Sequence, residues 1–153
     1  MTQEDKELLL KDLCARLPYN VIIDPVDCGK AILIGIKDGG LLLFDTIHKK
    51  EYDKPWDIEY IKPYLRPMSS MTEEEFESLK EYSGLKYDQL DLASFQNGAY
   101  KCLDFYLSEV PSYIVILVFD WLNKNHFDYR GLIERGLAIK VTKENNPYKT
   151  LKT

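Results

Sequence analysis

The sequence is poor in the residues from which metal, redox and nucleophilic sites are built. Its 153 residues include two histidines and three cysteines. Cys14, Cys28 and Cys102 are odd in number and far apart, so they match neither the paired short spacings of a zinc site nor the even count of a secreted disulfide framework. We therefore expect core or partly buried thiols, with no metal and no cofactor.

Long hydrophobic runs are also missing. The longest strongly apolar stretch covers residues 113–119, which is far shorter than the roughly 20 residues that span a bilayer. The first residues are acidic and do not form a basic region followed by an apolar run, the pattern of a secretory signal. The sequence therefore predicts a cytoplasmic protein that does not bind membranes.

Neither sign of charge dominates. The chain has 20 Lys and Arg against 25 Asp and Glu, and its net charge of −5 gives no general attraction to phosphate backbones. Hydrophobic residues make up 45% and charged residues 29%, a balance that excludes intrinsic disorder, collagen-like repeats and coiled coil as the dominant state. The length suits one domain, or a small domain with an appended subdomain.

The N-terminal part of the chain predicts a helix followed by a small sheet. Thr2 and Asp5 match a helix N-cap, and leucines then recur at helical spacing until Pro18 ends the helix. Short apolar segments indicate strands at residues 21–23, 31–36 and 41–44 and around 58–62. Residues 38–40 suit a tight hairpin turn. We expect an antiparallel sheet, with closure into a small barrel of the SH3 or Sm type as one alternative.

Strong local signals mark the middle of the chain. Pro63 and Pro67 remove two backbone donors, so the segment around them is predicted to be a connector and not sheet interior. Thr72 and Glu75 form a capping box that predicts the start of a helix. Gly84 is well placed to end this helix in a left-handed conformation.

The C-terminal half is predicted to be largely helical. Residues 92–110 fit one side of a second helix, and residues 113–125 suit either a helix or a strand, of which we favour the helix. A short helix is expected over 128–136, followed by either a short strand or a docked extended segment over 137–141. Residues 142–153 are polar and predict a flexible tail.

These elements together predict the α+β class, with an N-terminal helix, a small antiparallel sheet and a helical C-terminal half. Residues 1–66 would form the helix and the sheet, and residues 67–141 the helical part packed on them. We expect the two parts to behave as one cooperative domain.

Three segments resemble a family of short uncharacterised proteins encoded by gut anaerobes and their phages. They cover residues 12–19, 62–75 and 120–138, and the runs KPYLRPMSSMTEEE and HFDYRGLI carry the resemblance. The resemblance implies a cytoplasmic accessory protein from a mobile or phage-linked gene neighbourhood. The family has no established activity, so no catalytic role carries over. Where relatives tend to have glycine this chain has Asn20, which tolerates the left-handed turn expected there.

One cluster could support acid-base chemistry. His126 could act as a general base oriented by Asp128, with Arg130 holding an anionic substrate. We favour a structural interpretation in which Asp128 caps a helix, Tyr129 lies in the core and Arg130 pairs with Glu134. No nucleophile lies in a recognisable motif and no second histidine stands at ligand spacing. We therefore expect no enzyme, with a small enzyme centred on His126 as a lesser alternative.

A second cluster could contact nucleic acid. Trp56 and Tyr52 could stack on an exposed base while Lys49, Lys50 and Lys54 touch phosphates. We favour a solvated hairpin end in which Trp56 folds onto the sheet. A nucleic-acid-associated small barrel stays as the alternative function, and the net charge disfavours it.

The function we expect is a non-enzymatic interaction module that binds another protein, with a second copy of itself as one alternative. The missing catalytic set and the 11 tyrosines, which suit contact surfaces, support this expectation. The candidate binding residues are Trp56, Tyr64, Arg66, His126, Tyr129 and Arg130. If these side chains pack together inside the protein, the segments that contain them serve folding and not contact.

Overall fold

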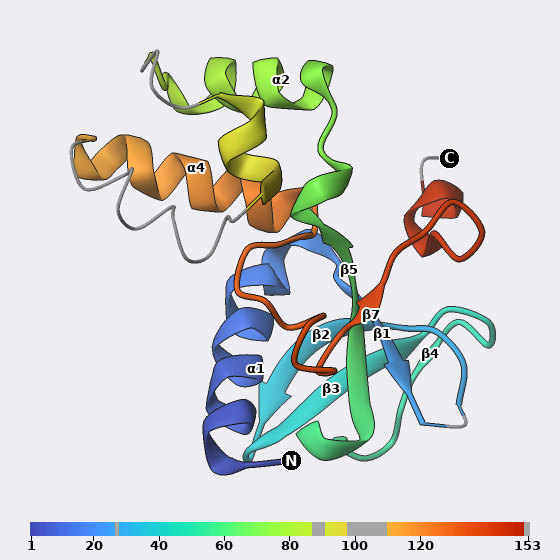
Figure 1. Cartoon of the computed structure of the whole chain (residues 1–153). Helices are drawn as coiled ribbons and strands as arrows, with labels where there is room; N and C mark the ends of the chain where they lie inside the picture. Colours follow the sequence, from blue (N-terminus) through green and yellow to red (C-terminus); the bar gives the residue numbers. More distant parts are fainter. Residues whose placement is uncertain (27, 87–90, 98–109, 152–153) are drawn as a thin grey trace. The chain divides into compact units, whose positions relative to one another are not determined.

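A computed structural model describes residues 1–26, 28–86, 91–97 and 110–151 (Figure 1). The chain forms two compact units, one made of Met1–Leu65 with Leu132–Thr153 and the other of residues Arg66–Gly131. Helices and a mixed sheet place the protein in the α+β class, as predicted. Residues 132–141, which were expected to be part of the helical region, lie in the first of these units.

The first unit begins with α1, Gln3–Arg16. The Thr2 side chain accepts a hydrogen bond from the Asp5 backbone N–H, so the predicted N-cap is confirmed. Leu9 and Leu13 are fully buried on the side of α1 that packs against the sheet. A short 3-10 helix follows, and Asn20 then has φ 53°, in the left-handed region expected for this turn.

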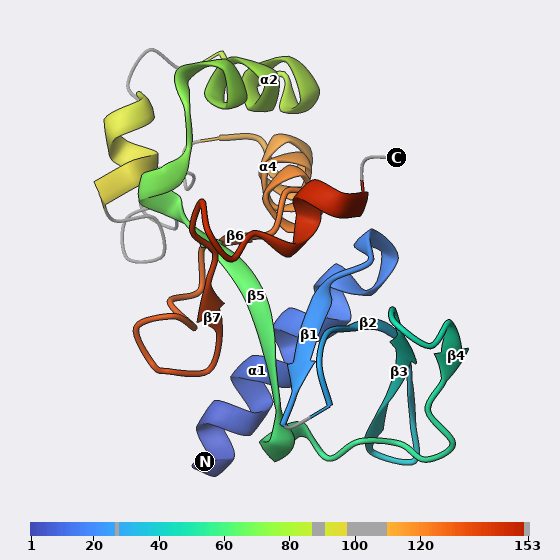
Figure 2. The same cartoon turned by 90° about the vertical axis from the view of Figure 1, so that its right-hand side faces the viewer.

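The sheet of the first unit is open. Its strands are β1 Ile22–Pro25, β2 Ala31–Lys37, β3 Gly40–Asp45, β4 Lys50–Glu51, β5 Ile61–Pro67 and β7 Ile139–Lys140. The antiparallel order is β4-β3-β2-β1-β5, and β7 pairs with β5 in parallel (Figure 2). The SH3 or Sm barrel expected as one alternative is therefore wrong. A barrel needs its end strands to pair with each other, whereas β5 pairs with β7 and β4 has only two residues.

The tight hairpin between β2 and β3 is confirmed. Asp38 has φ 51° and Gly39 has φ 79°, as a two-residue turn with two left-handed positions requires. Lys37 pairs with Gly40 directly across this turn. Farther along the hairpin, a register shift between Leu33 and Gly35 marks a bulge in β2.

The expected connector around Pro63 is instead a strand inside the sheet. β5 pairs with β1 on one side, where Pro63 faces Ile23, and with β7 on the other. A proline removes only its own donor, so the rest of the strand still bonds normally. The Leu65 carbonyl, for example, accepts from the Val141 N–H at 2.8 Å. Of the fourth strand expected around 58–62, Ile58–Tyr60 form a 3-10 turn, whereas Ile61 and Lys62 begin β5.

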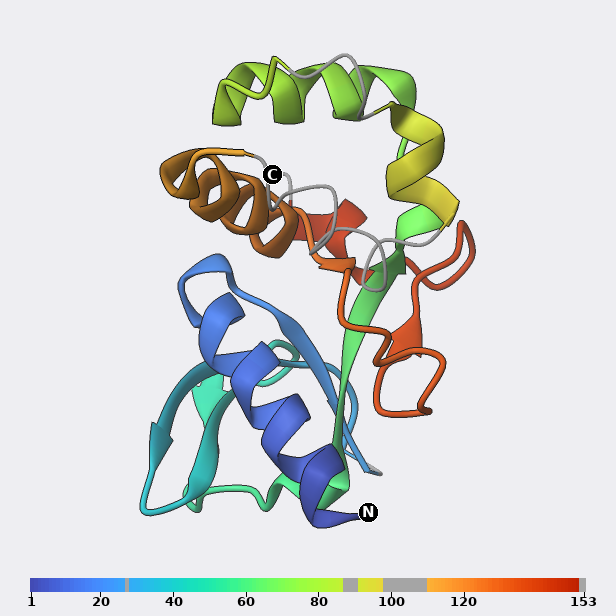
Figure 3. The same cartoon turned by 60° about the vertical axis from the view of Figure 1, so that its left-hand side comes forward.

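Two layers of side chains lie on the sheet of the first unit. Helix α1 lies across one face of the sheet (Figure 3). The larger layer, under α1, contains Leu33, Leu41 and Leu43 from the β2–β3 hairpin. A smaller cluster contains Ile22 and Tyr64 together with Val141. The inner face of the sheet is thus covered along the hairpin, whereas its other face has a small buried cluster at β1 and β5.

The second unit is mainly helical. It contains α2 Glu73–Ser83, a helical segment at 92–97, α4 Ser112–Lys124 and the short strand β6 Phe127–Asp128. Both halves of the predicted capping box are present at the start of α2, and Gly84 ends it with φ 73°. The helix favoured over 113–125 is confirmed as α4. Residues 98–109 of the helix expected over 92–110 lie outside the described residues, as does Cys102. Cys14 and Cys28 are exposed, so the expectation of core or partly buried thiols is wrong for these two.

The C-terminal residues fold back onto the first unit. Turns replace the short helix expected over 128–136, although a strand follows, one of the two alternatives predicted there. In the segment expected to be a flexible tail, Pro147–Leu151 forms a 3-10 helix. The Tyr148 hydroxyl donates to the Tyr64 carbonyl at 2.7 Å and accepts from the Ile22 N–H at 3.3 Å. These contacts attach the segment to β1 and β5. In the described part of the chain, no helix is long and apolar enough to cross a membrane.

Candidate functional site

The six candidate binding residues divide between the two units. Trp56 and Tyr64 belong to the first unit, and Arg66, His126, Tyr129 and Arg130 to the second. Tyr64, His126 and Tyr129 are at most 9% exposed, and Trp56, Arg66 and Arg130 are partly buried. None of the six is a fully exposed contact residue.

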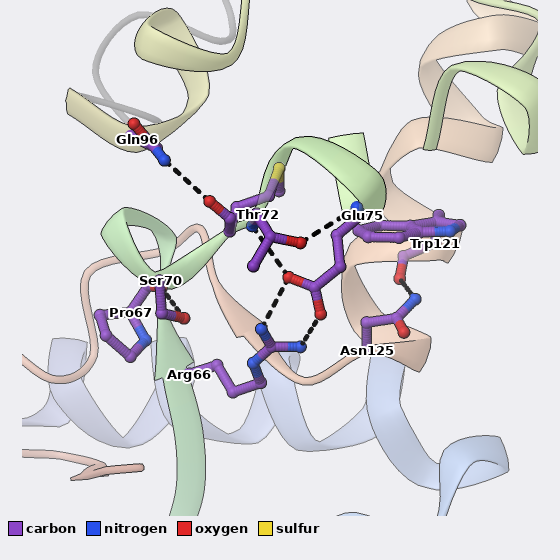
Figure 4. A network of polar contacts seen from close by, with 9 residues as sticks. Arg66, Pro67, Ser70, Thr72, Glu75, Gln96, Trp121 and Asn125 are labelled. Carbon is purple, nitrogen blue, oxygen red and sulfur yellow. Dashed lines mark hydrogen bonds and ion pairs between the residues drawn. The ribbon is translucent and has the colours of Figure 1, made fainter. Parts of the chain in front are cut away.

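Arg66 is held by an acid and an aromatic ring. Its two terminal nitrogens donate to the two carboxylate oxygens of Glu75 at 2.7 and 2.9 Å, a bidentate pair (Figure 4). The guanidinium carbon also lies 4.2 Å from the centre of the Phe127 ring, and Trp121 stacks on the same ring at 5.8 Å. Arg66 therefore links the end of β5 to the start of α2 and to β6.

Glu75 completes the capping box while it binds Arg66. Its carboxylate accepts from the Thr72 N–H at 3.0 Å, and the Thr72 hydroxyl accepts from the Glu75 N–H at 3.2 Å. Burial opposes ionisation of Glu75, but the hydrogen bonds from Arg66 and Thr72 outweigh it and lower the pKa of Glu75. The carboxylate is therefore engaged as a structural anion.

Other polar side chains of the second unit donate hydrogen bonds to backbone carbonyls of the same unit. The Gln96 amide donates to the Met71 carbonyl at 2.7 Å, and the Asn125 amide donates to the Trp121 carbonyl at 2.9 Å (Figure 4). The Ser70 hydroxyl donates to the Pro67 carbonyl at 2.8 Å. These contacts fix the turns that lead into α2 and out of α4.

His126 is part of the packing of the second unit. Its backbone carbonyl accepts from the Arg66 N–H at 2.8 Å, its φ is 59°, and its side chain is 9% exposed. The next two residues form β6, in which Asp128 pairs with Pro67. A general base must reach its substrate, and this histidine is largely enclosed.

Tyr129 lies in the core, as the structural interpretation expects. Its hydroxyl donates to Asn123 Oδ1 at 3.1 Å, and its ring packs on Phe119 at 5.0 Å. The Arg130 guanidinium carbon lies 4.8 Å from the centre of the Tyr129 ring. This arginine is thus placed over a core aromatic side chain.

Residues 12–19, the first of the three segments on which the family resemblance rests, contain a buried ion pair that was not predicted from the sequence. Arg16 donates to the two Asp12 carboxylate oxygens at 2.7 and 2.9 Å, and both side chains are 0% exposed. Asp12 and Arg16 are four residues apart on a predicted helix, and this spacing could have indicated the pair. With the Arg66–Glu75 pair and the buried Phe127 and Tyr129, this pair shows that all three segments supply internal contacts.

The loop with Trp56 is also partly enclosed. The Trp56 backbone pairs with Leu41, and its ring packs edge to face against Tyr52 at 5.5 Å. Both aromatic side chains pack against the cluster under α1. Trp56 therefore folds onto the sheet, as favoured above, and is not a free stacking platform.

Asp45 and His48 form a contact that the sequence analysis did not consider. The Asp45 carboxylate accepts from the Ile47 and His48 backbone N–H groups, and His48 Nδ1 lies 2.7 Å from Asp45 Oδ2. The backbone and ring contacts of His48 come first in lowering the pKa of Asp45 to about 2. The imidazole itself is 69% exposed. This geometry orders the loop after β3.

An apolar surface remains on the first unit. We call Ile32, Ile34, Leu42 and Phe44 the outer sheet face, because their side chains lie on the β2–β3 hairpin opposite the buried Leu33 and Leu43. Ile34 is 40% exposed and the other three are partly exposed. Buried and partly exposed positions alternate in β3. The sequence does not show this alternation, because the residues on both faces of the strand are apolar.

No family model matches the chain, and neither a curated protein nor a solved structure is significantly similar to it. Within the residues that the structure describes, no three His, Cys, Asp or Glu side chains gather closely enough to hold a metal ion.

Proposed function

We propose that the protein is a non-enzymatic interaction module that binds another protein. The proposal rests on the positions of the protein's polar and apolar side chains. The candidate polar residues Arg66, His126 and Tyr129 are engaged in packing, whereas large apolar side chains remain exposed on both units. Exposed apolar groups that are rimmed by polar residues are typical of interaction surfaces.

Helix α4 supports the proposal in the second unit. Ile114 and Val118 are buried on one side of α4, whereas Tyr113 and Ile116 on another side are 66% and 67% exposed. A helix that is apolar on all sides is usually covered on all sides. The outer sheet face gives the same kind of support in the first unit.

Affinity capture with matched baits tests the proposal. The full chain is immobilised beside the double variant Ile34→Lys/Ile116→Lys, and proteins retained from a lysate of the organism that encodes it are quantified by mass spectrometry. We expect a defined partner to be retained by the natural chain and lost from the variant, because a buried unpaired lysine disfavours an apolar interface. Equal capture by both baits, or specific turnover of a metabolite by the purified protein, would contradict the proposal.

The resemblance to proteins of gut anaerobes and their phages supports a narrower setting. We propose a cytoplasmic accessory protein from a mobile or phage-linked gene neighbourhood. Sequencing the genes on either side of its own gene tests this part. Integrase, capsid or conjugation genes nearby would support it, and a neighbourhood of housekeeping genes alone would contradict it.

A further inference from the structure

The outer sheet face departs from the usual pattern of a sheet with one covered side. Antiparallel sheets of this kind alternate apolar residues toward the core with polar residues toward solvent. Here α1 covers the inner face, yet the opposite side of the hairpin has Ile32 paired with Phe44. The bulge places Ile34 and Gly35 opposite Leu42, which extends the apolar surface by one more row.

This surface is continuous with one that the chain already covers. Ile32 pairs with Phe44 on one side and with Ile22 on the other, so the three form one row across β3, β2 and β1. Ile22 is 2% exposed because it lies in the cluster with Tyr64 and Val141, against which Tyr148 packs. The row is therefore buried at β1 and partly exposed at β2 and β3.

The covering segment shows what fits this row. It is the 3-10 helix Pro147–Leu151, and its aromatic residue Tyr148 lies against the cluster and hydrogen-bonds to the backbones of β1 and β5. An aromatic side chain buries a large apolar area while a hydroxyl satisfies neighbouring polar groups. A short segment with one aromatic side chain thus packs against the buried end of the row.

We propose that the outer sheet face binds a short segment of a partner protein, anchored by an aromatic side chain beside the Tyr148 segment. The inference rests on the proposed function and names the surface and the chemistry of the partner. Four side chains are far fewer than the roughly 20–30 residues that each partner contributes to a standard interface. A peptide-sized occupant fits this area better than a second folded copy.

Charged residues border the apolar centre. Lys30 precedes β2 and places its ammonium group 5.4 Å from the centre of the Tyr64 ring, and Glu51 of β4 pairs with Phe44. Both residues are exposed. An apolar centre with a polar rim of both signs is the anatomy of a protein interface.

Selection from a peptide library tests the inference with the full chain. A phage-displayed library of random dodecapeptides is panned against the natural chain. Affinities of the enriched peptides are then measured by fluorescence anisotropy for the natural chain, for Ile34→Lys and for Ile34→Thr, which keeps a β-branched residue in the strand. Ile116→Lys makes the same substitution at an exposed position of the other unit and serves as the matched control.

We expect the enriched peptides to contain an aromatic residue and to bind Ile34→Lys at least about tenfold more weakly, with Ile34→Thr intermediate and Ile116→Lys unchanged. Peptides that bind all four proteins equally, or a library without binders, would overturn the inference. So would self-association that is seen by sedimentation velocity and abolished by Ile34→Lys, because the occupant would then be a second copy. If the partner captured from the lysate is lost from Ile116→Lys but kept by Ile34→Lys, the proposed function is supported and the role of the outer sheet face is contradicted.

Discussion

Asp12 and Arg16 form a buried ion pair within α1. Both side chains are fully buried, and each carboxylate oxygen accepts from one guanidinium nitrogen. Removing one partner of a buried ion pair leaves the other charge without compensation, whereas replacing both with apolar residues is often tolerated. This asymmetry gives a direct test of a structural role.

Arg16→Met is expected to lower the free energy of unfolding by about 3–5 kcal/mol, because the Asp12 carboxylate remains buried without its partner. The double variant Asp12→Leu/Arg16→Met is expected to recover most of this loss. Urea unfolding followed by tryptophan fluorescence measures both. A double variant that is less stable than Arg16→Met would contradict a purely structural role.

Asp45 gives a prediction of pH dependence. Its folded pKa of about 2 lies below the unfolded value of about 3.9. Its contribution to stability is therefore fully present above the unfolded pKa and is lost as the pH falls from about 4 to about 2. An NMR titration of the Asp45 carboxyl carbon should show this low midpoint, with faster exchange of the Ile47 and His48 amides at the acid end. A midpoint near 4 would mean that the loop contacts do not persist in solution.

At the scale of elements, the C-terminal segment is attached through one side chain. The Tyr148 hydroxyl satisfies the Ile22 N–H and the Tyr64 carbonyl at the place where β1 and β5 meet the segment. Burial raises the pKa of Tyr148. The hydroxyl is therefore protonated near neutral pH and can donate to the Tyr64 carbonyl.

Tyr148→Phe is expected to destabilise the protein by about 1–3 kcal/mol, because two backbone groups lose their partner without a loss of apolar area. Tyr113→Phe makes the same change at a side chain that is 66% exposed and should leave stability unchanged. Chemical unfolding of both variants measures the difference. Equal stabilities would show that the segment is not held by this hydroxyl.

Elements with local signals could be predicted from the sequence, and elements defined by distant partners could not. The Thr72–Glu75 capping box, the Asp38–Gly39 turn and α4 each depend on residues a few positions apart. β5 was missed because prolines are read as breaks in isolation, whereas its pairing with β1 and β7 uses groups other than the missing donors. Its partners lie far away in the sequence.

The candidate site follows the same division. Arg66, His126 and Tyr129 could be selected because their side chains are chemically capable, but their burial depends on contacts with Glu75, Phe127 and Asn123 in other elements. The docking of Tyr148 onto Tyr64 joins residues 84 positions apart. No local pattern in the sequence indicates such a contact.

At the scale of the whole molecule, the two units have separate apolar clusters but share the strand β5, whose last two residues belong to the second unit. Unfolding either unit would free one end of this strand. We therefore keep the prediction of a single cooperative transition.

Fluorine NMR can follow both units in the unchanged sequence, because Trp56 lies in the first unit and Trp121 in the second. After incorporation of 5-fluorotryptophan, the folded signals of the two residues should decrease with the same midpoint in urea. Different midpoints would show that the units unfold independently.

The central claim is that the polar residues of the resembling segments maintain the fold while the outer sheet face makes the contact. The most direct measurement compares stability and peptide affinity in Arg66→Met and Ile34→Lys, using a peptide selected on the natural chain. We predict that Arg66→Met unfolds more easily but binds with unchanged affinity while folded, and that Ile34→Lys keeps its stability within about 0.5 kcal/mol and loses affinity. Loss of affinity in a stably folded Arg66→Met, with normal binding by Ile34→Lys, would contradict the account.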